Sequence, residues 1–472
     1  MMKNRDAKQN LETFSRLIQE IMNEIQQAQE QKLHLQTVEQ CEKHEAEIKA
    51  LTDRLHAVLM GQQLQRSLND DERMPAEERR ILQDLPGRYR SEGMRPVTIK
   101  TASGVEIVIW VRYYVKRGGN RRRNKNRGVY PALLLLGIQD HCTPNLAGEI
   151  GALAAAMSSY EEVQATLERR GIRFDDNTIR DLAYRLAQRA RAIQQQGFGD
   201  YEIKLSGKRV VVSTDGGRLR IRKNKPGKKT AKGRTRYRTD WKEPKVLIIY
   251  VVGPDGQKER SIAPFLDGTM KGPNEVFALI AYYLEKLGAV QAEHVVFVAD
   301  GAEWIWNRVP ALGEKLGLKP NQFHQVLDFY HAVEHLTKVA GLRKSWSQKQ
   351  RKSWVKKQRG LLIKGLVAKV IEAIQSLCHG RYSRSIRTEL NYFITHREHM
   401  KYHLNNELGL PIGSGGIESA VRRVVNLRLK GPSIYWKREN AEAMLFLRSY
   451  YKAGRWNILK NMAFSPESPA LV

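Results

Sequence analysis

The sequence predicts an α/β protein in which helical regions precede and interrupt a mixed sheet, and three observations support this class. Apolar strand-like runs alternate with helical segments between residues 205 and 335. Before them, residues 10–65 carry apolar side chains at helical spacing, and after them residues 336–408 have a helical pattern. The chain has 472 residues, which is enough for roughly two to four domains.

Residues 1–68 form the first helical region. Leu11, Phe14, Ile18, Ile21 and Ile25 follow the 3-4 spacing of a heptad seam. Such a seam either packs inside its own domain as a helical hairpin or joins copies of the chain in a coiled coil. The second interpretation predicts a homo-oligomer, a dimer or a larger assembly, and the sequence leaves both interpretations open.

Residues 69–144 combine a charged linker with a β hairpin and a basic loop. The run VTIKTASGVEIVIWVRYYV, residues 97–115, alternates apolar and polar side chains on both sides of Ser103-Gly104, which is typical of a hairpin. The segment KRGGNRRRNKNRG that follows is rich in basic residues and glycine, so it cannot form a core.

Residues 145–200 have the pattern of a helix-turn-helix domain. Ser159 and Glu162 form a predicted capping box for one helix, and Gly171 supplies a turn. Asp175 or Asp176 then caps a second helix. Two helices joined this closely predict either a DNA-binding helix-turn-helix or an ordinary helical hairpin.

Residues 205–335 carry the strand pattern. Strand-like runs cover residues 209–222, 245–253, 261–268, 293–301 and 323–329, and helical runs cover residues 273–288 and 302–312. Short connections predict an antiparallel meander for the first three strands, and helical crossovers bring the last two into the same sheet. This is the element order of a ribonuclease-H-like core. Residues 336–408 would then be a helical insertion, residues 409–455 the last helical part of the core, and residues 456–472 a tail.

The net charge predicts a polyanionic partner. The chain has 80 Lys and Arg against 50 Asp and Glu, a net charge of +30, and residues 1–90 contribute none of this excess, with 14 basic and 16 acidic side chains. A folded body this basic predicts a nucleic acid as the first candidate partner and a membrane surface as the second. The side chains expected to contact DNA are Arg121, Arg122 and Arg123 in the loop after the hairpin, Asn177, Thr178 and Arg180 at the start of the second helix of the helix-turn-helix, Arg218, Arg220, Arg222, Lys223, Lys228, Lys229, Arg234, Arg236 and Arg238 in a basic stretch, and Arg422 and Arg423 in the last core helix. Solvated loops are the alternative for both basic stretches.

The cysteines and the apolar runs exclude other classes. Cys41, Cys142 and Cys378 lie far apart, which argues against a disulfide framework or a cysteine-based zinc site. The N-terminus has no apolar signal core, and no apolar run is long enough to span a bilayer. We therefore expect a cytoplasmic protein with no membrane partner.

Acids at the ends of two predicted strands indicate a metal site. The runs VVVSTDGG and VVFVADG present Asp215 and Asp300, each after an apolar strand. Because these strands are neighbours in the predicted sheet, the two carboxylates converge, and Mg²⁺ or Mn²⁺, expected as two ions, would offset their repulsion. Glu418, in the first turn of the last core helix, is the candidate third acid, with capping and turn formation as the alternative roles. Trp304 and Trp306 either pack the helix after Asp300 or stack on a displaced base.

Four sequence blocks are STDGG, VADGAEWIW, LDFYHAVEHL and PIGSGGIES…LRLKGPSIYW. They resemble the signature blocks of bacterial insertion-sequence DDE transposases of the ISKra type, and more distantly those of Mutator-like enzymes. The resemblance covers roughly residues 145–455. It implies Mg²⁺-dependent DNA strand cleavage at transposon ends and strand transfer into target DNA, with Asp215, Asp300 and Glu418 as catalytic residues and metal ligands. It matches Asp328 and His331 to an auxiliary Asp-x-x-His pair, in which His331 orients a phosphate or a water. It also implies a bacterial, nucleoid-associated protein, although the cysteine-based knuckle expected before the helix-turn-helix is missing.

Two alternatives remain. The run HAVEH is an H-x-x-E-H pattern, in which His331 and His335 would ligate zinc and Glu334 would act as the base of a metallopeptidase. No third ligand stands out, and this function would leave the basic charge unexplained. The other alternative keeps the fold and is a domesticated DNA-binding protein or a ribonuclease-H-like nuclease without transposition activity.

Overall fold

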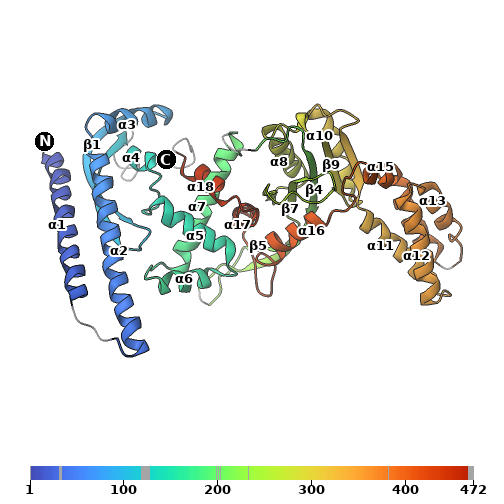
Figure 1. The fold of residues 1–472 in the computed structure, drawn as a ribbon, viewed down its shortest axis with the longest axis horizontal. Coiled ribbons are helices and arrows are strands. Elements are labelled where there is room, and N and C mark those ends of the chain that lie inside the picture. Colours follow the sequence, from blue (N-terminus) through green and yellow to red (C-terminus); the bar gives the residue numbers. More distant parts are fainter. Residues whose placement is uncertain are drawn as a thin grey trace. The chain divides into compact units, whose positions relative to one another are not determined.

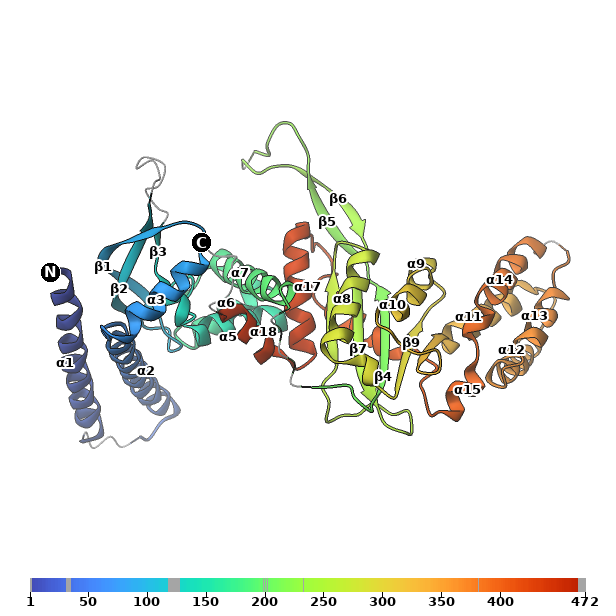
Figure 2. The same cartoon turned by 90° about the horizontal axis from the view of Figure 1, so that it is seen from above.

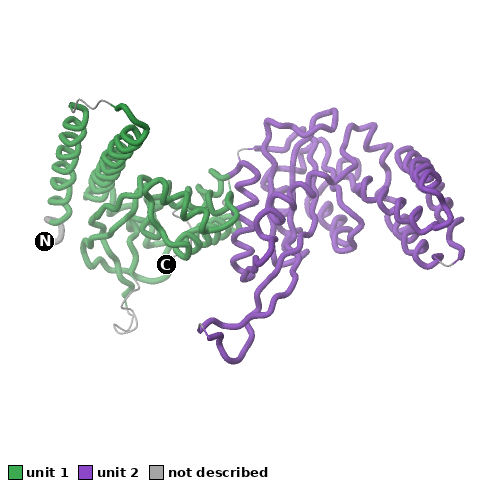
Figure 3. The backbone as a smooth tube through the Cα atoms, turned by 90° about the horizontal axis from the view of Figure 1, so that it is seen from below, with its two compact units in different colours: residues 1–200, 456–472 green, residues 201–455 purple. Residues whose placement is uncertain are grey.

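The structure is a computed structural model that describes residues 2–30, 35–117, 128–197, 199, 201, 203–231, 233–380 and 382–465. Helices make up 55% of the chain and strands 17%, so the predicted α/β class is confirmed. Among the described residues, no helix combines the length and the apolar character needed to cross a membrane. The chain divides into two compact units (Figure 3): unit 1 is Met1–Asp200 with Trp456–Val472, and unit 2 is Tyr201–Arg455.

Unit 1 begins with two long helices, α1 (Met2–Glu30) and α2 (Val38–Leu68), which lie side by side (Figure 1). They pack on a sheet of β1 (Tyr89–Lys100), β2 (Glu106–Lys116) and β3 (Gly128–Val129). β1 and β2 form the predicted hairpin, which turns at Gly104 with a φ of 83°. Phe14 and Ile21 of the predicted seam share one buried core with Ile99 and Ile109 of this sheet. The seam is therefore used inside unit 1, as the hairpin interpretation predicts.

The charged segment after α2 contains a helix, α3 (Arg73–Asp84). Met74 and Ile81 are buried in the core of unit 1 and give the helix an apolar face. Glu78 is only 1% exposed and accepts hydrogen bonds from Arg112 and Tyr114 at 3.0 and 2.9 Å. The linker prediction is wrong for this segment. Its many charged residues are typical of a linker, but two of its apolar residues lie in the core and one of its acids forms a buried ion pair.

The second half of unit 1 is helical. Its helices are α4 (Pro131–Leu135), α5 (Pro144–Ala156), α6 (Tyr160–Arg169), α7 (Asp176–Gln195) and α18 (Trp456–Phe464). Leu146, Val163 and Ile179 belong to their shared core. The expected tail at residues 456–472 instead contains α18, which packs on α7 and buries Leu459 and Met462. These apolar side chains explain why the segment folds back onto unit 1.

Unit 2 contains a five-stranded mixed sheet with the order β10-β9-β4-β7-β8. Its strands are β4 (Arg209–Gly216), β7 (Lys245–Val252), β8 (Phe265–Thr269), β9 (His294–Ala299) and β10 (Phe323–Leu327). β4, β7 and β8 form an antiparallel meander, whereas β9 pairs parallel with β4 and β10 pairs parallel with β9. The predicted meander and the predicted contact between the strands of Asp215 and Asp300 are both present.

Helices cover both faces of this sheet. The ring of Phe277 in α8 (Pro273–Lys286) stacks on Phe297 of β9, with 5.9 Å between the centroids. A Cβ atom at Gly416 of α16 (Gly415–Val421) would lie 3.1 Å from Tyr250 of β7. Phe297 and Tyr250 pair with consecutive residues of β4, and consecutive side chains of a strand point to opposite faces. The helices α8 and α16 therefore lie on opposite faces of the sheet.

The remaining helices of unit 2 follow the last two strands. After β9 come α9 (Glu303–Trp306) and α10 (Val309–Lys315), and after β10 the chain is helical, as predicted. These later helices are α11 (Phe329–Leu342), α12 (Gln348–Ile363), α13 (Val367–Gln375), α14 (Ser383–His396) and α15 (Tyr402–Glu407). α16 continues into a π-helical turn at Arg422–Asn426, and α17 (Arg438–Lys452) packs on β8.

The run predicted as one strand at residues 209–222 is two strands. β4 ends at Gly216, and β5 (Leu219–Asn224) pairs with β6 (Tyr237–Lys242) in a separate two-stranded sheet. The N–H of Gly217 donates to the carbonyl of Pro244 at 2.9 Å, next to the end of the β4–β7 ladder. The chain then leaves the sheet, and the β5–β6 hairpin projects from it (Figure 2).

Candidate active site at the carboxyl edge of the sheet

Three aspartates stand at the carboxyl ends of three adjacent parallel strands. Asp215 is the penultimate residue of β4, Asp300 follows β9 and Asp328 follows β10. When the two parallel ladders are continued by one to three residues, all three aspartates fall at the same level. By the alternation of side chains along a strand, they belong to the face that α16 covers. We call these three residues and their surroundings the acid edge.

Asp215 lies in a partly desolvated position. Burial raises its pKa to about 6, and the negative charges of Asp300 and Glu243 also raise it. The Gly216 N–H, which donates to Asp215 Oδ1 at 2.6 Å, and the Lys245 ammonium act in the opposite direction. The repulsion between the Asp215 carboxylate and its neighbouring carboxylates favours a divalent cation at this position, because the cation would offset that repulsion.

Asp300 is held by the start of α9. Its Oδ1 accepts from the N–H of Ala302 at 3.0 Å, and its backbone oxygen accepts from the indole N–H of Trp306 at 2.6 Å. Trp306 is 8% exposed, and the ring of Trp304 has the Lys245 ammonium 3.7 Å from its centroid. Both tryptophans thus have contacts within unit 2, which agrees with the packing interpretation.

Glu418, the third predicted acid, does not join Asp215 and Asp300. α16 packs on β4 and β7 through Ile417 and Ala420, which are buried, whereas Glu418 is exposed. Across the described part of the chain, no group of three or more His, Cys, Asp or Glu side chains is arranged to hold a metal ion. The structure therefore brings Asp215 and Asp300 together and leaves Glu418 outside that pair. The pair still fits Mg²⁺, because Mg²⁺ is bound in proteins through one or two carboxylates, with water and substrate phosphates completing its coordination.

Asp328 joins two helix starts. It is 2% exposed, and its Oδ1 accepts from the N–H groups of Tyr330 and His331, at 2.7 and 3.3 Å, as the cap of α11. Its Oδ2 accepts from the N–H of Ser414 at 3.2 Å and from the Ser414 hydroxyl, at the start of α16. Four donors use the acceptor capacity of this carboxylate. Asp328 is therefore placed to position α11 and α16, and its oxygens are already engaged.

Local sequence patterns did not indicate four side chains beside the acid edge, namely Glu243, Lys245, Tyr392 and His396. Glu243 and Lys245 form an ion pair at 2.7 Å, and Lys245 is 4% exposed. A Cβ atom at Gly301 would lie 2.3 Å from the Tyr392 ring and 3.2 Å from His396 Nε2, so α14 reaches the residue after Asp300. The position of Glu243 just before β7 was available from the predicted meander, but nothing local marks Tyr392 or His396.

The β5–β6 hairpin carries the basic stretch that was expected to contact DNA. Between Gly216 and Thr239 the sequence has eleven Lys or Arg and no acid. The guanidinium groups of Arg218 and Arg220 lie 5.3 and 5.6 Å from the Trp241 ring centroid. Arg222 lies 5.4 Å from the Tyr237 ring centroid. Cations interleaved with aromatic rings suit the phosphates and bases of a nucleic acid.

The other predicted basic contacts differ in their surroundings. Lys223 forms an ion pair with Asp240 at 3.0 Å, which neutralises part of the hairpin. In the last core helix, Arg422 is exposed, and Arg423 is half-buried and donates to the carbonyl of Ser419 at 3.4 Å. Among the other predicted contacts of the β5–β6 hairpin, Lys228, Lys229, Arg234, Arg236 and Arg238 are exposed. The residues Arg121, Arg122 and Arg123 lie outside the described residues.

In unit 1, α6 and α7 form the predicted pair of helices around a turn. Asp175 caps α7 by accepting from the N–H of Thr178 at 2.9 Å and from its hydroxyl at 2.6 Å. The exposed Asn177 accepts from Arg180 at 2.8 Å, and Arg180 also pairs with Asp181 at 2.9 Å. All three predicted contact residues at the start of α7 thus have partners within the helix, and a nucleic-acid contact would have to replace some of these bonds.

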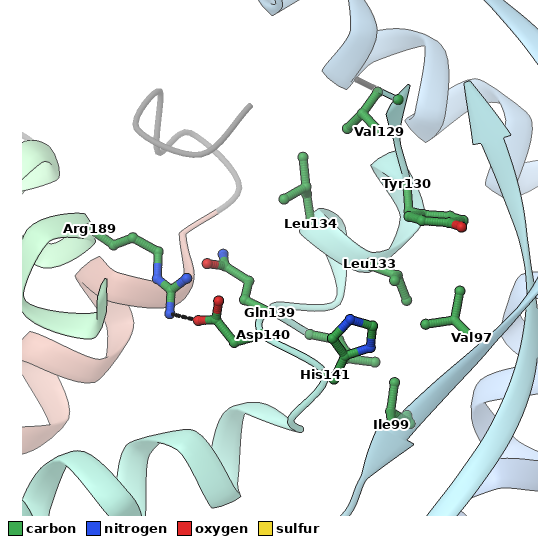
Figure 4. Close-up of a pocket in the computed structure, with 12 residues that line it drawn as sticks. Val97, Ile99, Val129, Tyr130, Leu133, Leu134, Gln139, Asp140, His141 and Arg189 are labelled. Carbon is green, nitrogen blue, oxygen red and sulfur yellow. Dashed lines mark hydrogen bonds and ion pairs between the residues drawn. The ribbon is translucent and has the colours of Figure 1, made fainter. Parts of the chain in front are cut away.

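Unit 1 also contains a cavity of about 330 Å³ (Figure 4). Apolar side chains line most of it, including Ile99, Leu133 and Leu134. At its polar end the buried Arg189 of α7 donates to Asp140 at 2.8 Å. Asp140 has a φ of 55°, a left-handed conformation that aspartate tolerates better than most residues. No sequence pattern predicted this cavity.

No known family model matches this chain, and no curated protein matches it significantly. The functional assignment therefore depends on the residues of the acid edge and of the basic hairpin.

Proposed function

We propose that this chain is a DDE transposase, which cleaves DNA strands at transposon ends and transfers them into target DNA with Mg²⁺ or Mn²⁺. The observation that carries the proposal is the pair of Asp215 and Asp300 at the ends of neighbouring parallel strands, where burial and the charge of Asp300 raise the pKa of Asp215 to about 6. The sheet supports the same proposal. A three-stranded meander with two parallel strands beside its first strand is the arrangement expected of a ribonuclease-H-like core, and α12 to α15 would be its helical insertion.

Asp215 and Asp300 would hold the metal, one or two ions, with Glu418 as a third ligand. When bound, the metal supplies charge stabilisation at the attacking and leaving oxygens of a phosphodiester. Attack of water breaks one P–O bond and releases a 3′-hydroxyl, and attack of that hydroxyl on a target phosphodiester breaks a second P–O bond and joins the strands. Glu418 lies in the first turn of α16, and Asp328 holds Ser414, the residue that precedes this helix.

Double-stranded DNA, from both the transposon end and the target, would contact the β5–β6 hairpin and the start of α7. Two ends must be held together during transposition, so we propose a dimer or a larger assembly. Phe14 and Ile21 are buried within unit 1, so another surface would join the copies. The expected location is the bacterial cytoplasm, at the nucleoid.

The test is a cleavage and strand-transfer assay with the full-length protein, Mg²⁺ and DNA that contains the ends of its own element. Asp300→Asn should lower the cleavage rate by about 100-fold or more, as expected when charge stabilisation of the transition state is removed. Glu303→Gln is the matched control, since Glu303 is an acid at the start of α9, three residues from Asp300. It should cleave at nearly the wild-type rate. Wild-type cleavage by Asp300→Asn would contradict the proposal.

A nuclease or a domesticated DNA-binding protein with the same fold is the second candidate, and the position of Glu418 outside the aspartate pair favours it. The same assay separates the candidates. Cleavage without joining would indicate a nuclease, whereas binding without cleavage would indicate a DNA-binding protein.

A further inference from the structure

Two histidines of α11 direct their Nε2 atoms toward each other. His331 and His335 are four residues apart, so they share one face of the helix. Their Nε2 atoms are 3.4 Å apart. The pair His294 and His324, on the β9–β10 ladder, makes a shorter contact of the same kind, with ring nitrogens 3.0 Å apart, so the 3.4 Å contact is a long hydrogen bond that a metal ion would replace. Two imidazole ligands of one tetrahedral Zn²⁺ have their nitrogens about 3.3 Å apart, since each Zn–N bond is about 2.0 Å.

The surroundings of His335 fix its ring in an orientation suited to metal binding. Nδ1 of His335 lies 2.5 Å from Oε2 of Glu389 in α14. A carboxylate accepts and does not donate, so the proton of this contact belongs to Nδ1, and Nε2 presents a lone pair toward His331. Tyr392 stacks on the His335 ring, with centroids 3.7 Å apart and planes 12° apart, and holds its plane. Carboxylates orient the histidine ligands of known metal sites through the same contact.

The local charge favours a cation, although the whole chain carries +30. Two carboxylates lie beside the histidine pair: Glu389 contacts Nδ1 of His335, and Oε2 of Glu334 lies 3.5 Å from Nδ1 of His331. Lys338 is a cation that acts on His335 from the same helix. The side chain of His331 is 34% exposed, so an ion can enter from solvent.

We propose that His331 and His335 bind a divalent transition-metal ion of the Zn²⁺ class through their Nε2 atoms, with Glu389 as the orienting carboxylate of His335. Imidazole nitrogens suit Zn²⁺, whereas Mg²⁺ prefers oxygens, so this site differs in chemistry from the Asp215–Asp300 pair. The described residues provide two imidazoles without a third His, Cys, Asp or Glu at the same point. Water therefore completes the coordination, and the site lacks the third protein ligand of a catalytic zinc centre. Zinc bound here would take the place of the phosphate- or water-orienting role expected of His331, and the zinc measurement itself does not depend on DNA cleavage.

The test measures zinc bound to the full-length protein after removal of metal with a chelator and equilibrium dialysis against buffered Zn²⁺. His331→Ala and His335→Ala should each bind one equivalent less than the wild type. Glu389→Gln should weaken that equivalent by about 10-fold or more, as expected when the partner of a metal-bound histidine is lost. X-ray absorption of the bound zinc should show two imidazole nitrogens at about 2.0 Å.

Two control variants separate this site from zinc bound elsewhere on the chain. His324→Ala removes a histidine pair of the same unit and should keep the full zinc content, and Asp300→Asn should keep it even where DNA cleavage is lost. Circular dichroism without metal checks that each variant is folded. Because His331 is partly exposed, His331→Ala should disturb folding less than His335→Ala. Wild-type zinc content in His331→Ala, loss of zinc in His324→Ala, or a spectrum without imidazole nitrogens would overturn the proposal.

Discussion

Replacing Asp215 by Asn should stabilise the protein at neutral pH. Burial and neighbouring charge raise the pKa of Asp215 from its usual 3.8 to about 6, so the unfolded chain loses this proton at lower pH than the folded one. Ionisation of Asp215 therefore costs stability, beginning above pH 3.8 and reaching its full extent above about pH 6. The difference between these two pKa values corresponds to about 3 kcal/mol, and partial solvent access reduces this free energy to roughly 1–3 kcal/mol. Asn keeps the acceptor for the Gly216 N–H and carries no charge, so the variant gains this free energy above pH 7 and almost none at pH 4.

Thermal unfolding followed by circular dichroism across this pH range measures the effect. For a unit of this size, the gain should raise Tm by roughly 3–9 °C at neutral pH, and added Mg²⁺ should narrow the difference because it stabilises only the wild type. Asp328→Asn is the matched control, the same substitution at a neighbouring strand end. Four donors bond to Asp328, so its variant should lose about 2–4 kcal/mol. Equal Tm values for Asp215→Asn and wild type at neutral pH, or a gain that persists unchanged at pH 4, would mean that ionisation of Asp215 does not cost the folded protein stability.

Three further predictions concern other parts of the chain. Replacing Arg220 and Arg222 by Gln should weaken DNA binding and reduce the steepness of log affinity against log salt by roughly 2, measured by fluorescence anisotropy. An unchanged slope would argue against contacts between these arginines and phosphates. Gly301→Ala places a Cβ atom 2.3 Å from Tyr392 and should cost about 1–3 kcal/mol, with faster hydrogen exchange in α14; wild-type exchange there would show that α14 does not depend on this contact. Asp140→Asn leaves a buried arginine of unit 1 without its charge partner and should cost about 3 kcal/mol in thermal unfolding, whereas an unchanged Tm would mean that the pair adds no stability.

The acid pair could be predicted because its signals are local. An apolar run that ends in Asp-Gly marks both Asp215 and Asp300, and the order and length of the connections place their strands side by side. Glu418 was predicted from its place in the first turn of a late helix, which is also local. Whether the helix brings Glu418 to the pair depends on how α16 sits on the sheet, and no local pattern encodes that contact.

The surroundings of the pair could not be predicted because they arise from contacts between distant segments. Tyr392 and His396 follow Asp300 at a long distance in sequence, and only the packing of α14 against Gly301 brings them together. The two misjudged segments, α3 and α18, failed for a different reason. α3 is mostly polar, whereas α18 (WNILKNMAF) is apolar but short. In both segments the buried residues become significant only when the core of unit 1 is known.

Mn²⁺ binding followed by electron paramagnetic resonance decides whether Asp215 and Asp300 together hold a divalent ion. The full-length wild type should bind Mn²⁺, one or two ions, at a site that Asp215→Asn and Asp300→Asn each remove and that His335→Ala retains. Undiminished Mn²⁺ binding in both aspartate variants would contradict it.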